Sequence, residues 1–84
     1  MATVILTTAA QADFDDLPVT IRARVLTVFE RLRAWPATSG AKPMRGALAG
    51  HYRIRTGDWR VLFHPVGSTV IVDRIANRRD VYDE

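Results

Sequence analysis

The chain has 84 residues, no cysteine and a formal net charge of +3. This length predicts one small domain, residues 1–84, and the lack of cysteine excludes a disulfide framework and a Cys-based zinc site. No apolar run approaches the roughly 20 residues that span a bilayer, and the N-terminus lacks the basic start of a signal peptide, so we expect a cytoplasmic protein.

The positive charge is concentrated in the second half of the sequence. Residues 1–39 carry four basic and four acidic side chains, whereas residues 40–79 carry eight basic side chains and two aspartates, a net charge of +6. A one-sided basic surface suits a polyanion or an acidic protein partner. Small domains also have basic faces that only contact water, so the charge alone leaves both interpretations open.

The first half predicts a short strand followed by two helices. Residues 3–7 are β-branched and favour a strand, after which Thr7 or Thr8 can cap a short helix through residues 9–17. Pro18 is expected to open a second helix and Pro36 to close it. One stripe of apolar residues follows helical spacing and predicts the core face, with a partner-binding groove as the alternative: Ile21, Val25, Val28, Phe29 and Leu32. Residues 36–50 are rich in Pro, Gly and Ala and are interpreted as a connector.

Residues 51–64 predict a β-hairpin with Gly57-Asp58 as a two-residue type II′ turn. Pairing outward from this turn sets Arg55 opposite Arg60 and His51 opposite His64. One face is then apolar and expected to meet the helices: Tyr52, Ile54, Trp59, Val61 and Phe63. The other is basic and expected to be open to solvent: His51, Arg53, Arg55, Arg60, Leu62 and His64. A slip of one residue would scramble both faces, which supports this register.

The crowded arginines favour an anion-binding surface over side chains that merely extend into water. Like charges directly opposite one another are destabilising, and a bound phosphate would remove the repulsion while matching the planar guanidinium fork. A last strand is expected at residues 69–76, followed at once by Arg78 and Arg79. Tyr82 then either anchors the chain end or stacks on a base.

The run from residue 42 to residue 82 resembles the RelE/ParE superfamily, in particular the RelE-type toxins of type II toxin–antitoxin pairs. The matching pieces, in order, are a K-P-x-x-G linker, a Y-R-I-R strand, a G-D-[WY]-R-V turn and strand, and an R-R-x-V-Y close. The helical pair joined at Leu17-Pro18 also fits. The resemblance implies an α+β fold of order β-α-α-β-β-β, the RelE-like microbial ribonuclease fold, in which a two-helix hairpin packs on a small, mostly antiparallel sheet.

The resemblance also implies an activity and its partners. The activity is ribosome-dependent cleavage of mRNA in the A site, which inhibits translation and uses no metal or cofactor. The implied partner is a small acidic or amphipathic antitoxin, with DNA contacted only through the toxin–antitoxin complex and no membrane involved. Carried over residue by residue, the catalytic set is Arg53, Arg55, Arg60, Arg78 and Tyr82. As further RNA contacts on the basic surface we expect Lys42, Arg45, Arg79 and His51.

Two departures from the family pattern bear on mechanism. Many relatives have His just before the closing Arg, where this chain has Asn77, and others have Lys on the strand that carries Arg53 and Arg55. Arginine stays protonated at neutral pH and cannot act as a base, although it can stabilise transition-state charge. We therefore expect in-line attack by the RNA 2′-hydroxyl with a weak or borrowed base. His51 and His64 are candidates for the base, but four strand residues separate them from Arg55 and Arg60, roughly 13 Å.

Two other functions remain open at the level of sequence. A ParE-like toxin directed at gyrase would share the fold and use it as a binding module. A degenerate toxin would act only as an antitoxin-binding co-repressor.

Overall fold

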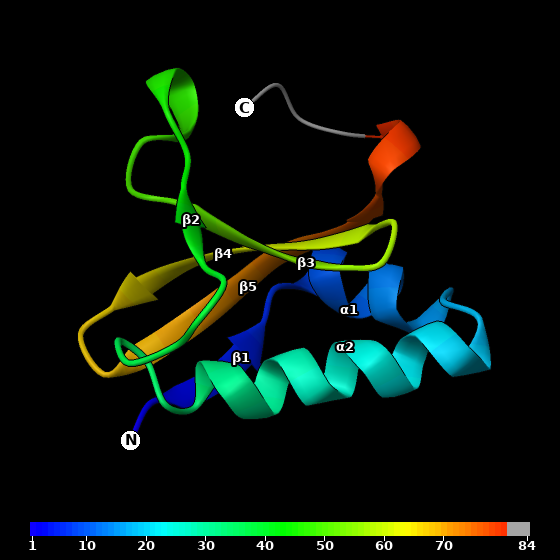
Figure 1. Cartoon of the computed structure of the whole chain (residues 1–84), viewed down its shortest axis with the longest axis horizontal. Coiled ribbons are helices and arrows are strands. Elements are labelled where there is room, and N and C mark those ends of the chain that lie inside the picture. The colour runs from blue at the N-terminus through cyan, green and yellow to red at the C-terminus, as the bar shows by residue number, and fades with distance from the viewer. Residues whose placement is uncertain (81–84) are drawn as a thin grey trace.

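The chain folds into two layers, with two helices packed on one face of a five-stranded sheet (Figure 1). The computed structural model describes residues 1–80. Its elements are β1 (Thr3–Leu6), α1 (Thr8–Asp15), α2 (Val19–Leu32), β2 (Lys42–Pro43), β3 (Tyr52–Thr56), β4 (Trp59–Val66) and β5 (Thr69–Asn77), with 3₁₀ turns η1 (Gly46–Leu48) and η2 (Arg78–Asp80). The strand order is β1-β5-β4-β3-β2, and only the β1–β5 pair is parallel within the described chain. The predicted α+β fold with a mostly antiparallel sheet is confirmed.

Residues 36–50 are more than the predicted connector. Within them, Lys42 and Pro43 form the short edge strand β2, which pairs antiparallel with Arg53 and Tyr52 of β3. The prediction was wrong here because a two-residue strand that contains proline carries no alternation of apolar side chains. This pairing sets Lys42 directly beside Arg53, so two of the predicted site residues are neighbours across β2 and β3.

The helices form where the capping and stripe residues predict them. Thr7 is the N-cap of α1, and its hydroxyl oxygen accepts a hydrogen bond from the Ala10 N–H at 3.1 Å. In α2 the predicted stripe faces the core, with Val25, Val28 and Leu32 fully buried. Phe29 is only half-buried, and its ring lies 6.0 Å from that of Phe14. Within residues 1–80 no helix is long and apolar enough to cross a membrane.

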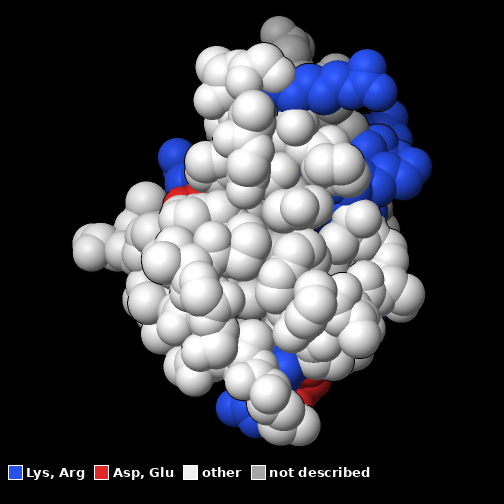
Figure 2. Space-filling model, turned by 90° about the vertical axis from the view of Figure 1, so that its left-hand side faces the viewer, with Lys and Arg blue, Asp and Glu red and all other residues white. Residues whose placement is uncertain are grey.

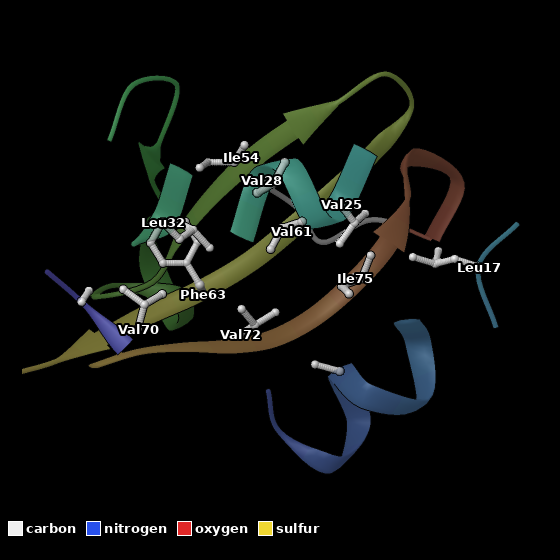
Figure 3. Packing of buried hydrophobic residues seen from close by; sticks show 12 residues of the cluster. Leu17, Val25, Val28, Leu32, Ile54, Val61, Phe63, Val70, Val72 and Ile75 are labelled. Carbon is white, nitrogen blue, oxygen red and sulfur yellow. The ribbon is translucent and has the colours of Figure 1, made fainter. Parts of the chain in front are cut away.

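The core lies between α2 and the inner face of the sheet (Figure 3). Phe63 is completely buried at its centre, and its ring lies 5.3 Å from that of Trp35 and 5.8 Å from that of Tyr52. Around it pack aliphatic side chains from α2, β3, β4 and β5: Val25, Val28, Leu32, Ile54, Val61, Val70 and Val72. Burying these branched side chains on one face leaves the opposite face of the hairpin free to carry charge.

The β3–β4 hairpin has the register that the face separation predicts. Arg55 pairs with Arg60, Ile54 with Val61, and Tyr52 with Phe63. Gly57 has a φ of +61°, and no non-glycine residue within residues 1–80 has a positive φ, as a type II′ turn with Gly first requires. One expectation was wrong: Leu62 lies on the basic face but is only 5% exposed.

An irregularity in β5 changes which side chains face the core. Leu62 pairs with Arg74 but Phe63 pairs with Val72, so Asp73 is an extra residue that forms a β-bulge. Val72 is buried before the bulge and Ile75 after it. The bulge therefore lets β5 return an apolar side chain to the core while Asp73 and Arg74 follow one another outside it.

Candidate functional site

Basic side chains gather on the sheet face opposite the two helices. The β3–β4 register sets Arg55 beside Arg60. Two residues away on β3, Arg53 lies beside Lys42 of β2. Figure 2 shows basic side chains in adjoining groups along one upper side of the molecule, whereas most of the face in view is uncharged. The charge asymmetry of the sequence thus becomes a localised basic surface.

Three arginines from separate segments meet at the turn between β3 and β4. Arg55, Arg60 and Arg78, together with Gly57 and Asp58, line a shallow pocket of about 190 Å³. The main chain holds Arg78 in place, because its N–H donates a hydrogen bond of 2.7 Å to the Asp58 carbonyl. The Arg78 and Asp58 side chains are both largely exposed and lie 3.6 Å apart, an ion pair that solvent weakens.

The electrostatics at this pocket favour an anion. Burial, followed by the positive charges of Arg55, Arg53 and Arg78, lowers the pKa of Arg60 from its ordinary value. Arg60 remains a cation at neutral pH, since arginine titrates far above that range. Its charge is therefore held at a free-energy cost that a bound phosphate would reduce.

The structure gathers some of the predicted site residues and separates others. Arg79 follows Arg78 in η2 and is exposed. Arg45 precedes η1. His51 immediately precedes β3, at the end of the hairpin remote from the turn, and its carbonyl accepts a hydrogen bond from the Met44 N–H at 2.9 Å. Tyr82 lies outside the described residues.

Two residues that do not line the pocket contact the segments that form it, and these contacts were not predicted from the sequence. Arg24 extends from α2 to the hairpin turn, where a Cβ added to Gly57 would lie only 3.0 Å from its Nη1. Asn77 accepts a hydrogen bond at its Oδ1 from the Arg79 N–H at 3.1 Å, and so shapes the turn that carries Arg78. Helical periodicity places Arg24 outside the apolar stripe but does not show that it reaches Gly57.

Comparisons with known proteins give one consistent result. The family described as the ParE toxin of the type II toxin–antitoxin system parDE matches residues 4–82. Toxin RelG of Mycobacterium tuberculosis is 37% identical over 83 residues, which cover 95% of this chain and 94% of RelG. In the crystal structure of the toxin–antitoxin complex RelBE2 from the same organism, one chain is 35% identical with a TM-score of 0.81, covering 92% of this chain and 98% of that one.

A more distant structure has the same fold. A chain of the RelB–RelE antitoxin–toxin complex from Methanococcus jannaschii is 24% identical, with a TM-score of 0.77 over 94% of this chain and 95% of that one. The fold and the sequence similarity are therefore those of a toxin from a type II toxin–antitoxin system. Within that class, the chain belongs to the RelE/ParE superfamily and is similar to RelG.

Proposed function

We propose that this toxin is a ribosome-dependent endoribonuclease that cleaves mRNA in the A site. The observation that carries the proposal is the meeting of Arg55, Arg60 and Arg78 at one open pocket. Such a cluster fits the scissile phosphate, because three guanidinium groups can share the charge that builds up on its oxygens. Arg53 lies two residues before Arg55 on β3 and pairs with Lys42 of β2, and this pair is suited to the neighbouring phosphate.

In the proposed reaction, the bonds to phosphorus that form and break all lie within the RNA. The 2′-oxygen attacks the adjacent phosphorus, the bond from phosphorus to the 5′-oxygen breaks, and the products are a 2′,3′-cyclic phosphate and a 5′-hydroxyl. One proton leaves the 2′-hydroxyl and one reaches the departing 5′-oxygen. Arg55, Arg60 and Arg78 would stabilise the phosphorane-like transition state. Preorganised positive charge lowers the activation free energy most where negative charge builds up in this way.

The identity of the proton acceptor constrains this mechanism. Arginine does not act as a base at neutral pH, and His51 and His64 lie roughly 13 Å along the strands from the Arg55–Arg60 pair. We propose that the base is borrowed from the ribosome or from water, and that positioning and charge stabilisation provide most of the rate. Tyr82, a residue outside the described chain, is proposed to stack on a flanking base.

We infer that an antitoxin segment controls the activity. RelBE2 of M. tuberculosis is a toxin–antitoxin complex, and its similar chain covers nearly all of this one. Two surfaces of this chain suit an amphipathic acidic segment: the basic face, and the flank of the helices. On that flank Val19 and Leu26 are 73% and 51% exposed and border a shallow hollow of about 380 Å³ together with Phe14. An antitoxin that covers the basic face would block access of RNA to the pocket.

The match to the ParE family favours a second candidate, a toxin directed at gyrase. A degenerate toxin that only binds its antitoxin is the third. Primer extension on mRNA after induction separates the three. New 5′ ends within A-site codons support the ribonuclease. Intact mRNA together with damaged DNA or altered supercoiling supports the gyrase toxin. The absence of both effects supports the binding module. The proposal is refuted if induction arrests growth while the mRNA stays intact.

A further inference from the structure

A second cluster of functional side chains lies on the basic sheet face, at the end remote from the hairpin turn. His51 comes from just before β3, His64 from β4 and Asp73 from the bulge in β5. One ligand atom from each of these side chains lies within 4.8 Å of the other two. These are the only two histidines of the whole chain.

The distances within the cluster divide its members into two groups. Asp73 Oδ2 lies 2.7 Å from His64 Nδ1, a hydrogen bond, but 3.6 Å from His51 Nε2, which is beyond hydrogen-bond length. The imidazole ring centroids lie 4.9 Å apart. Two ligands of a tetrahedral ion with bonds of about 2.0–2.1 Å lie roughly 3.3 Å apart. The His51–Asp73 separation is therefore close to that of two groups that share one ion.

Only Nε2 of the His51 ring is accessible to an ion. Its Nδ1 is buried and has no hydrogen-bond partner within the described residues. Nε2 lies on the Asp73 side, and the three side chains are between 22% and 30% exposed. Water and small ions can therefore reach the cluster, while the sheet fixes the backbone behind each ligand.

We propose that His51, His64 and Asp73 form a three-ligand site for a divalent transition metal of the Zn²⁺ type. Two imidazole nitrogens and one carboxylate oxygen suit Zn²⁺, Ni²⁺ or Cu²⁺, whereas Mg²⁺ and Ca²⁺ prefer oxygen ligands alone. Partial exposure leaves a fourth position for water. For an ion to bind, the hydrogen bond between His64 Nδ1 and Asp73 Oδ2 must break, so that both atoms can turn toward the ion.

The bulge in β5 and the strand order bring one ligand each from β4, β5 and the start of β3 to the same site. An ion held there would join three strands of the sheet, and an ion that binds only the folded state raises its stability by mass action. The site lies apart from the Arg55–Arg60–Arg78 pocket, so the inference does not depend on the ribonuclease proposal.

Isothermal titration of tag-free protein with Zn²⁺ alone tests the site. We expect one ion per chain, a higher melting temperature with Zn²⁺, and no such change with Mg²⁺. His51→Gln and Asp73→Asn should each weaken the affinity by about 100-fold, at or beyond the upper end of the loss seen when residues around metal ligands are changed. Glu30→Gln, which changes an exposed acid on α2, should bind Zn²⁺ like the wild type.

Two further measurements distinguish a loss of metal binding from a loss of folding. Circular dichroism without metal checks that each variant is folded, and the shift of the imidazole proton resonances on adding Zn²⁺ shows whether both rings bind. The inference is overturned if millimolar Zn²⁺ leaves either imidazole unshifted. It is equally overturned if folded His51→Gln and Asp73→Asn bind Zn²⁺ as tightly as the wild type.

Discussion

Asp13 tests how β5 is held in place at Ile75, three residues before Arg78 of the candidate site. β1 ends at Leu6, so it does not cover the outer edge of β5 beyond Val72. There Asp13 Oδ2 accepts a hydrogen bond of 2.9 Å from the Ile75 N–H and one of 2.8 Å from Arg74 Nε. The carboxylate thus takes the place of a missing neighbouring strand.

The size of the effect follows from these contacts. A hydrogen bond to a charged group contributes about 1.5–3 kcal/mol. The Arg74 side chain is 48% exposed, so its ion pair with Asp13 is expected to contribute under about 1 kcal/mol to the free energy of unfolding. Asp13→Ala should therefore lower the free energy of unfolding by about 2–3 kcal/mol at pH 7. Asp13→Asn keeps an acceptor for the Ile75 N–H and should cost roughly 1 kcal/mol.

The pH dependence has a definite sign. Burial acts to raise the pKa of Asp13, but hydrogen bonds from Arg74 and the Ile75 N–H, with the Arg74 charge, outweigh it and lower the pKa below 3.8. The stabilisation is therefore fully present above the unfolded-state pKa, about 3.9, and is lost as the pH falls through the lower folded-state value.

Urea melts of the wild type, Asp13→Asn and the exposed control Asp16→Asn from pH 7 to pH 2.5 measure this difference. The gap between the wild type and Asp13→Asn should be constant above about pH 5 and shrink below about pH 4. Equal stability at pH 7, or a gap that widens in acid, would refute the assigned role of Asp13.

Three further predictions concern the core, the arginine cluster and the partner. Phe63→Ala should cost about 3–5 kcal/mol in a denaturant melt, whereas Phe29→Ala, at a half-buried site, should cost roughly 2 kcal/mol; equal costs would contradict the packing. Arg60→Ala should change the free energy of unfolding by less than about 1 kcal/mol, since it relieves like-charge repulsion; unfolding would make Arg60 structural. Association with an acidic antitoxin should slow as salt rises in stopped-flow measurements, and a salt-independent rate would argue against the basic face.

The hairpin could be predicted from sequence because its signals are local. Gly57 marks the turn, and only one register separates Ile54 and Val61 from Arg55 and Arg60. That register is confirmed and already brings two of the site arginines together. The arrival of Arg78 at the same turn depends on β5 pairing with β4, which the order of strands in the family resemblance implies.

Other features depend on contacts that no local pattern carries. Asp13 lies about sixty residues from Arg74 and Ile75, so nothing near it in the sequence shows that it covers a strand edge. The bulge at Asp73 did leave a signal, because the apolar spacing changes from Val70 and Val72 to Ile75. The distance between Phe29 and the core centre is a matter of helix placement, which the stripe alone does not determine.

The rate of single-turnover mRNA cleavage on programmed ribosomes tests the proposed function most directly. Arg60→Ala and Arg78→Ala should each lower this rate by about 100-fold or more, the scale of losing one transition-state charge partner. Arg60→Lys should recover part of it, because it restores the charge without the fork. Arg53→Ala should mainly weaken binding.

Arg33→Ala is the matched control for this measurement, because Arg33 is exposed at the end of α2, on the layer opposite the basic face. It should cleave at the wild-type rate. If Arg60→Ala and Arg78→Ala also cleave at that rate while remaining folded, the arginine pocket is not the site of RNA cleavage.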